Sequence, residues 1–188
     1  MLQVEKTALE GVLILTPARF GDARGFFSES WNATHMRKAG LHFDFVQDNH
    51  SMSERAGTIR GLHFQTPPHA QAKLVRCGRG ALFDVAVDIR TDSPSYGKWV
   101  GVDLSYENGK QLLIPEGFLH GFVTREPMTE IIYKCSAHYA PECDAAIRFD
   151  DPDIGVDWGI DTAQAVLSEK DTKAAFLKDS PSPFTLKG

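Results

Sequence analysis

Apolar and polar residues alternate with a period of two in several short stretches of the chain. The clearest is 83–90, where Phe83, Val85, Val87 and Ile89 alternate with polar or small residues. This pattern predicts a half-buried β-strand, because successive side chains of a strand point to opposite faces. Similar runs, separated by turn residues, predict strands at 73–77, 99–104, 111–114, 130–135 and 147–149. Many short strands at this spacing predict an all-β sandwich or barrel.

Helix is expected in only two short stretches. The first covers residues 32–40, where Gly40 would end the helix. The second opens at Ser168, because Ser168 and Asp171 have the spacing of a capping box. With 188 residues and no long spacer, residues 1–188 are expected to form a single domain.

Composition describes an ordinary soluble protein, with 42% hydrophobic and 24% charged residues. The apolar runs are too short to cross a bilayer, and the N-terminus lacks the plan of a signal peptide, so we expect no membrane partner and a cytoplasmic location. Three cysteines without a Cys-x-x-Cys pair indicate reduced, buried thiols rather than a disulfide framework or a thiolate zinc site.

The net charge of -5 argues against nucleic acid as a partner, because phosphate backbones require a basic surface. Cationic residues nevertheless gather locally at Arg60, Lys73, Arg76 and Arg79. A small phosphorylated ligand therefore stays possible.

Three polar residues lie in strand-like surroundings where their chemistry could matter. By alternation, His63 shares a face with Gln65, Lys73 shares a face with Val75, and Tyr133 lies among apolar neighbours. Each residue alone is more typical of a structural role: a hydrogen-bonded histidine, a solvated lysine or a core tyrosine. A function must therefore come from their combination.

A turn with the pattern Pro115-x-Gly117-x-x-His120 follows the predicted strand at 111–114. It resembles the second motif of the cupins, in which the histidine points into a β-barrel. A metal-dependent cupin would also carry His-x-His and then Glu, but Gln65 and Lys73 stand in that region. A lysine ammonium would repel a divalent cation, so we expect neither a metal nor another cofactor.

Longer stretches carry a closer resemblance. They occur in order over roughly residues 20–160 and include 22–29, 45–51, 60–65, 71–76, 84–88, 115–118, 133–134 and 151–152. These stretches resemble the dTDP-4-dehydrorhamnose 3,5-epimerase family, and many motifs in order are more specific than any one. The resemblance implies a metal-free cupin jelly roll with a few short helices, mainly near the C-terminus. It also implies an isomerase that epimerises dTDP-4-dehydro-6-deoxy-D-glucose at C3 and C5 through an enolate, in dTDP-L-rhamnose biosynthesis.

The resemblance implies four catalytic residues. His63 matches the base, and an imidazole suits that task because its ordinary pKa lies near neutral pH. Tyr133 matches the acid on the other side of the sugar ring, and Lys73 matches the cation that stabilises the C4 oxyanion. Asp171 matches the carboxylate that orients the base. The capping box gives Asp171 a purely structural alternative, and the sequence supports both roles equally.

The resemblance also implies the substrate-binding residues and a homodimer with sites near the subunit interface, into which an N-terminal segment of the partner reaches. The substrate-binding residues are Arg24, Glu29, Gln47, Asp48, Asn49, Arg60, Lys73, His120, Asp144 and Lys170. Two positions depart from the family pattern. Asp144 stands where glutamate is expected and Phe149 where tryptophan is expected.

Three alternatives stay open. A relative with the same site could invert only one carbon, because positioning of the ring decides how far the reaction goes. A metal-dependent cupin is disfavoured by the missing ligands. A non-catalytic sugar-binding module would not need the set of His63, Lys73 and Tyr133.

Overall fold

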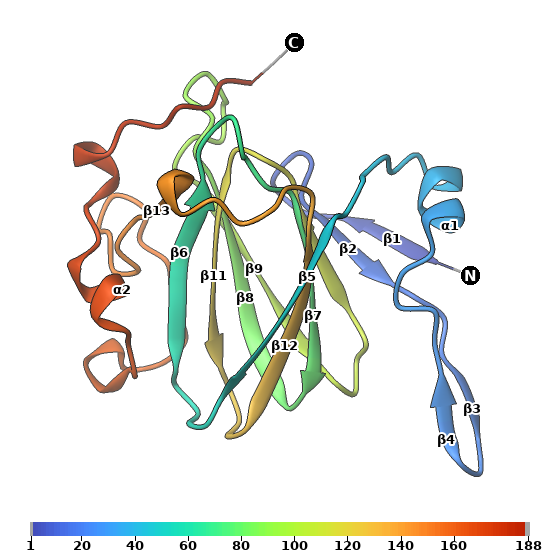
Figure 1. Ribbon diagram of the computed structural model, residues 1–188. Helices are drawn as coiled ribbons and strands as arrows, with labels where there is room; N and C mark the ends of the chain where they lie inside the picture. The colour runs from blue at the N-terminus through green and yellow to red at the C-terminus, as the bar shows by residue number, and fades with distance from the viewer. Residues whose placement is uncertain (1, 187–188) are drawn as a thin grey trace.

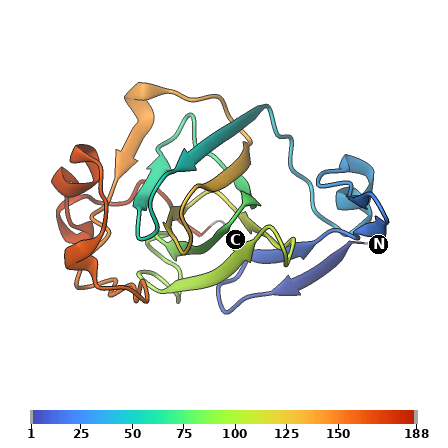
Figure 2. The same cartoon turned by 90° about the horizontal axis from the view of Figure 1, so that it is seen from below.

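The computed structural model describes residues 2–186, which form mostly antiparallel β-strands arranged in two sheets that face each other (Figures 1 and 2). The six-stranded sheet has the order β1 (Gln3–Lys6), β2 (Leu13–Thr16), β10 (Gln111–Ile114), β7 (Lys73–Arg79), β12 (Thr129–Cys135), β5 (Gln47–Ser53). The five-stranded sheet has the order β13 (Asp144–Ala146), β6 (Ile59–Gln65), β11 (Phe118–Thr124), β8 (Ala81–Asp88), β9 (Trp99–Ser105). A separate hairpin of β3 (Phe20–Asp22) and β4 (Gly25–Phe27) projects from the body (Figure 1).

Helices are short and lie outside the sheets. They are α1 (Ala33–Lys38), α2 (Glu169–Lys173) and the 3-10 turns Pro141–Cys143, Thr162–Gln164 and Leu177–Asp179. The predicted all-β class with a few short helices is confirmed. Asn32 caps α1 by accepting from the backbone N–H groups of Thr34 and His35, and Gly40 follows with a φ of +78°. The helix therefore begins and ends where the sequence predicts.

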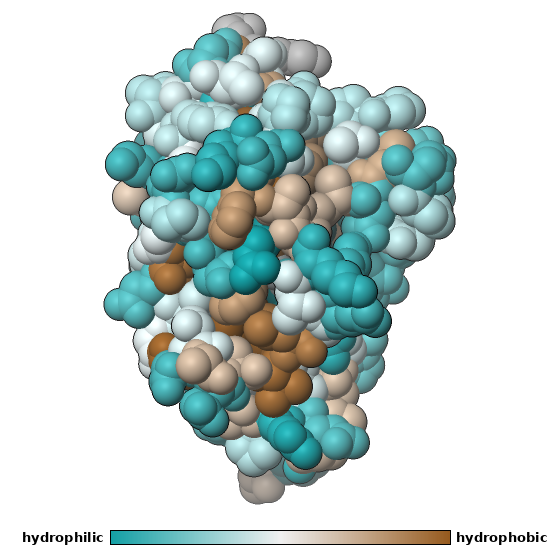
Figure 3. All heavy atoms as spheres, turned by 90° about the vertical axis from the view of Figure 1, so that its left-hand side faces the viewer, coloured by the Kyte–Doolittle hydropathy of each residue, from teal (hydrophilic) through white to brown (hydrophobic). Residues whose placement is uncertain are grey.

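Three apolar clusters hold these layers together. The first lies between the two sheets and includes Val75, Leu112 and Ile131. The second lies on the outer face of the five-stranded sheet, where the C-terminal segment covers it, and Figure 3 shows this covering from outside as a largely hydrophilic surface with a small hydrophobic area. The third lies beneath α1 and contains Met36 and Leu74. Burial on both sides of the five-stranded sheet makes it the rigid support for side chains that point inward.

The strand predicted at 83–90 forms as β8, but it is not half-buried. Val85 and Val87 belong to the cluster under the C-terminal segment, while Ala86 belongs to the cluster between the sheets. Asp84 and Asp88 are 0% exposed. The prediction of one solvent-exposed face was wrong. Alternation separates the two faces of a strand, but it does not show which of them another layer covers.

The strand predicted at 147–149 is not formed. The strand β13 ends at Ala146. Ile147 exchanges backbone hydrogen bonds with Leu62 of β6 and forms an isolated bridge with Ala175. Phe149 instead packs in the outer cluster, and its carbonyl accepts a hydrogen bond from Trp158 Nε1 at 2.9 Å. An alternation of three residues is too short to separate a strand from a loop that buries apolar side chains.

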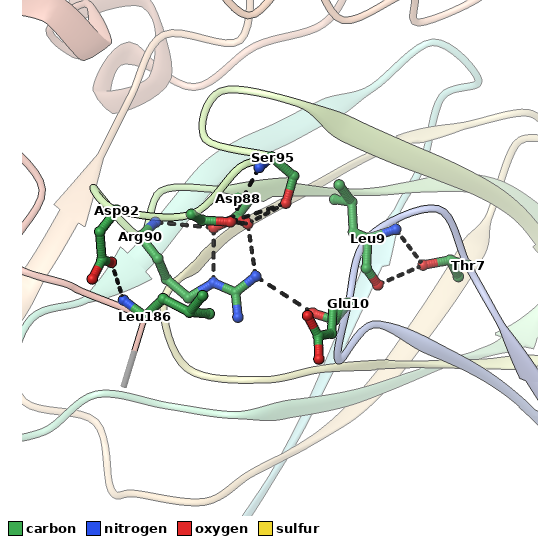
Figure 4. A network of polar contacts seen from close by, with 9 residues as sticks. Thr7, Leu9, Glu10, Asp88, Arg90, Asp92, Ser95 and Leu186 are labelled. Atoms are coloured by element: carbon green, nitrogen blue, oxygen red, sulfur yellow. Dashed lines mark hydrogen bonds and ion pairs between the residues drawn. The ribbon is translucent and has the colours of Figure 1, made fainter. Parts of the chain in front are cut away.

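A buried polar network ties the far end of β8 to the surrounding loops (Figure 4). Asp88 accepts hydrogen bonds from Arg90, Ser93 and Ser95, and Arg90 also contacts the carbonyl of Glu10. Burial raises the pKa of Asp88, but these hydrogen bonds outweigh it and lower the pKa to about 2.

No helix within residues 2–186 has the length and apolar character needed to span a membrane.

Candidate active site

His63 and Asp171 form a hydrogen-bonded pair near one edge of the five-stranded sheet. His63 lies on β6 and Asp171 on α2, 108 positions apart in the chain, with His63 Nε2 and Asp171 Oδ1 separated by 2.5 Å. Burial would raise the pKa of Asp171, but hydrogen bonds with His63, Ser168 and the Gly61 backbone lower it. The carboxylate is therefore ionised and accepts from Nε2–H, which leaves Nδ1 of His63 with a free lone pair.

The short helix α2 delivers Asp171 to this position. Ser168 is the N-cap residue, and its hydroxyl accepts the backbone N–H of Asp171 at 3.1 Å. The carboxylate of Asp171 meanwhile contacts His63. The capping geometry and the pairing with His63 use different atoms of one residue, so the two roles coexist.

His120 and Asp84 form a second pair, deeper between the sheets. His120 on β11 lies directly across from His63 on β6. Its Nε2 lies 2.8 Å from Asp84 Oδ1, and the two side chains are 7% and 0% exposed. Burial lowers the pKa of His120 despite the opposing charge of Asp84, and Lys73 and His63 lower it further. His120 is therefore a neutral imidazole that donates to Asp84.

Lys73 enters the same region from the six-stranded sheet. It lies on β7, is 9% exposed, and shares its inward face with Val75. Within residues 2–186, the Lys73 ammonium group forms no ion pair, because no carboxylate oxygen lies within 4 Å of it. Burial lowers the pKa of Lys73, and the charges of Cys135 and Asp84 partly oppose this. Lys73 is thus a buried amine without an ion-pair partner in that part of the chain.

Tyr133 lies on β12, the strand beside β7, and is the cross-strand partner of Val75 and Asn49. Its ring centroid is 6.4 Å from that of His120, so the two sheets meet at these rings. Burial raises the pKa of the Tyr133 hydroxyl, with Cys135 adding to the effect and Asn49 and Arg60 opposing it. The phenol therefore keeps its proton at neutral pH and can donate it.

A third polar group adjoins the His63 pair. Asp144 on β13 accepts from Lys170 Nζ at 2.5 Å and from the Tyr139 hydroxyl at 3.1 Å. The backbone N–H of Tyr139 donates to Gln47 Oε1 at 2.9 Å, and Gln47 in turn donates to Asn49. Tyr139 is 57% exposed, and the sequence analysis did not single it out. Because Lys170 and Asp171 are consecutive, this group and the His63 pair share helix α2.

Four predicted binding residues lie apart from this cluster or make other contacts. Asp48 faces the opposite side of the six-stranded sheet and pairs with Lys134 at 2.8 Å. Arg24 lies in the projecting hairpin with its side chain 90% exposed, paired with Asp22. Glu29 pairs with His35 near α1, and Arg60 contacts Ser53 and Met52. Within this chain, Asp48, Arg24 and Glu29 are not brought to His63.

Asp84 is the residue that the sequence analysis missed most clearly. The sequence does contain an indication of its role: an aspartate within an alternating apolar run is costly to bury unless polar partners compensate it. Alternation predicts a half-buried strand whose polar side, with Asp84, faces solvent, whereas Asp84 is buried between the sheets.

The cluster combines a partly exposed imidazole, a buried cation and a protonated phenol. The five-stranded sheet supplies His63 and His120, and the six-stranded sheet supplies Lys73 and Tyr133. Across residues 2–186, no three His, Cys, Asp or Glu side chains are grouped to hold a metal ion. Such a set can remove a proton beside a carbonyl, stabilise the resulting oxyanion and return a proton from a different direction.

Known proteins with similar sequences and structures agree with this description. The family model of dTDP-4-dehydrorhamnose 3,5-epimerase matches residues 6–179. The dTDP-4-dehydrorhamnose 3,5-epimerase of Salmonella typhimurium is 51% identical over 178 residues, which cover 94% of this chain and 96% of that protein. The enzyme of the same name from Sinorhizobium fredii is 50% identical over 180 residues, covering 96% of this chain and 92% of that protein.

A solved structure gives the same result for the fold. The dTDP-6-deoxy-D-glucose-3,5-epimerase of Legionella pneumophila, in complex with dTDP-4-keto-L-rhamnose, superposes with a TM-score of 0.93 at 41% identity and covers 100% of both chains. Two facing antiparallel sheets, the paired His63 and Asp171, and similarity along nearly the whole sequence lead to one conclusion: this chain belongs to the dTDP-4-dehydrorhamnose 3,5-epimerase family.

Proposed function

We propose that this protein is a dTDP-4-dehydrorhamnose 3,5-epimerase, an isomerase that inverts C3 and C5 of dTDP-4-dehydro-6-deoxy-D-glucose. The observation that carries the proposal is the pairing of His63 with the buried Asp171, in a cluster that Lys73 and Tyr133 enter from the facing sheet. Family membership supports the choice of substrate, as does the sugar nucleotide bound to the Legionella relative.

The first step is removal of a proton beside the C4 ketone. The Nδ1 lone pair of His63 takes the proton from C3 or C5, and the electrons of that C–H bond form an enolate whose charge rests on the C4 oxygen. Asp171 fixes the tautomer and stabilises the imidazolium that forms. The Lys73 ammonium stabilises the oxyanion, an interaction that is strong because Lys73 is shielded from water.

The second step returns a proton to the opposite face of the same carbon. Tyr133 is the proposed donor, because it is partly buried and its raised pKa keeps it protonated. The enolate electrons form the new C–H bond, and the ketone at C4 is restored. Exchange with solvent then removes the proton from His63 and returns one to Tyr133. The same two groups act again at the second carbon, so no cofactor enters the reaction.

We further propose that the protein works as a homodimer whose hairpin reaches the partner's site. Phe20 and Phe27 of the hairpin are 64% and 66% exposed, more than an isolated chain would favour. Arg24 lies at the tip of this hairpin with its side chain 90% exposed, and Figure 1 shows the hairpin projecting from the side of the body opposite to α2, which carries Asp171. A neighbouring subunit would cover the phenylalanines and receive Arg24 and Glu29 as ligands for the nucleotide diphosphate.

We also propose a cytoplasmic location. Cys77, Cys135 and Cys143 are all free and buried. Free thiols are typical of proteins kept in a reducing compartment.

Incubation of the protein with dTDP-4-dehydro-6-deoxy-D-glucose in D2O, followed by proton NMR and mass spectrometry, tests the activity. Two deuterons are expected, at C3 and at C5, and His63→Ala should abolish both. Deuterium at one carbon only would identify the single-centre reaction. Absence of deuterium with the wild-type protein would overturn the enolate mechanism for this substrate.

A further inference from the structure

Within residues 2–186, two buried ionisable side chains of the site form no ion pair with a lysine, arginine or carboxylate. Asp84 is 0% exposed, and its Oδ2 has no hydrogen-bond partner within residues 2–186. Lys73 is 9% exposed and makes no ion pair in the same part of the chain. Burying a single charge is costly unless an opposite charge lies nearby. Asp84 and Lys73 are both buried between the facing sheets. Asp84 is tied to His120, whose ring lies 6.4 Å from that of Tyr133 on the strand beside Lys73. The two groups lie more than 4 Å apart, and the charge of Asp84 acts on Lys73 across that space.

The other carboxylate close enough to act on Lys73 is already neutralised. The groups whose charges act on Lys73 are Cys135, Asp84, Asp144 and Lys170. Asp144 and Lys170 form an ion pair with one another at 2.5 Å, so their effects on Lys73 largely cancel. The thiol of Cys135 has its pKa raised by burial and is therefore neutral near pH 7. Asp84 is left as the anion that acts on Lys73.

The partner of Asp84 does not neutralise it either. Asp84 Oδ1 takes a hydrogen bond from Nε2 of His120, which burial keeps as a neutral ring. The ionisable groups that face His120 are Asp84, Lys73 and His63. A neutral imidazole fixes the direction of the carboxylate without removing its charge. The pair thus presents an oriented anion to the interior of the site.

We propose that Asp84, held in place by His120, is a positioning residue that keeps the Lys73 ammonium group charged. Asp84 does not contact the reacting atoms in this scheme; it acts through Lys73. The consequence for turnover rests on the proposed epimerase function, in which Lys73 must be a cation to stabilise the enolate. The effect on Lys73 itself is a property of the ligand-free protein.

The test measures the titration of Lys73 directly. Protein labelled with 13C at the lysine ε carbons is titrated by NMR, and the Lys73 resonance is identified by its absence in Lys73→Arg. In Asp84→Asn the titration midpoint should fall by about one pH unit or more, because an opposing charge is removed. Asp84→Glu keeps the charge and should restore most of the shift.

Asp88→Asn is the matched control. Asp88 is also 0% exposed and lies on the same strand, but its partners are Arg90, Ser93 and Ser95. Its loss should leave the Lys73 midpoint unchanged, even if the protein becomes less stable. Should Asp84→Asn not fold, Asp84→Ser makes the same comparison with a smaller side chain that leaves space for water. An unchanged Lys73 midpoint in the folded charge-free variant would overturn the proposal.

Turnover gives an independent readout. The alkaline fall of kcat should move to lower pH in Asp84→Asn by the same amount as the NMR midpoint, whereas general damage to the fold would lower kcat at every pH. A fall of kcat that leaves the pH profile in place would contradict the role in catalysis. If the wild-type protein does not epimerise the substrate, the proposed function fails, while the NMR titration still decides the relation between Asp84 and Lys73.

Discussion

His63 and His120 are direct cross-strand partners, and Nε2 of each ring lies against a buried carboxylate. They differ in access to solvent, since 31% of the His63 side chain is exposed and only 7% of His120. A base must reach its substrate and exchange its proton with water, so His63 is the one placed for proton transfer. His120 instead supports the interior charges. Two neighbouring histidines of one sheet therefore form similar pairs with different tasks.

Removing the charge of Asp171 should impair the base without unfolding the protein. Asp171→Asn keeps the backbone N–H that Ser168 accepts, so α2 retains its cap. The amide can no longer stabilise the imidazolium of His63, and the epimerisation rate should fall by about 10²- to 10⁴-fold. Steady-state kinetics measures the rate, and thermal unfolding verifies the fold. A folded variant with the wild-type rate would contradict the role of Asp171.

Tyr133→Phe should separate proton removal from inversion. His63 still takes the proton and exchanges it with D2O, so recovered substrate should gain deuterium without a change of configuration. Net inversion should fall by about 10²- to 10⁴-fold, because the acid on the other face is gone. NMR of the recovered sugar nucleotide compares exchange with inversion. A parallel loss of both would show that Tyr133 is not the proton donor.

The proposed dimer can be tested by mixing two damaged subunits. If Arg24 acts in the partner's site, Arg24→Ala and His63→Ala should complement each other, because each mixed dimer then has one intact site. Random reassociation after gentle denaturation should restore roughly a quarter of wild-type activity, since about half of the dimers are mixed. Each variant refolded alone is the control. Lack of recovery in the mixture would place Arg24 and His63 in the same subunit's site.

Acid stability should depend on Asp88. Hydrogen bonds lower its pKa from 3.8 to about 2, so its contribution is present above pH 4 and is lost as the pH falls toward 2. The shift corresponds to about 2 kcal/mol of unfolding free energy. Urea unfolding between pH 6 and pH 2.5 should show that Asp88→Asn is less stable than wild type near neutral pH, with a smaller difference in acid. A constant difference across this range would contradict the prediction.

Several local features of the protein could be predicted from the sequence. The alternation in 60–65 and 73–77 places His63 on the face opposite to Leu62 and Lys73 on the face opposite to Leu74, as the apolar clusters confirm. Asn32 and Ser168 mark the beginnings of both helices. These features depend on residues that are close together in the sequence, where backbone geometry alone relates one side chain to the next.

The tertiary structure decided which of these faces meet. Asp171 lies 108 positions from His63, and their contact exists because the C-terminal segment folds over the outer face of the five-stranded sheet and places α2 beside β6. The C-terminal segment covers the outer face of β8, and the six-stranded sheet covers its inner face, so that Asp84 is buried between the sheets rather than exposed to water. Periodicity states which side chains share a face, but burial depends on what packs against that face, and distant parts of the chain supply it.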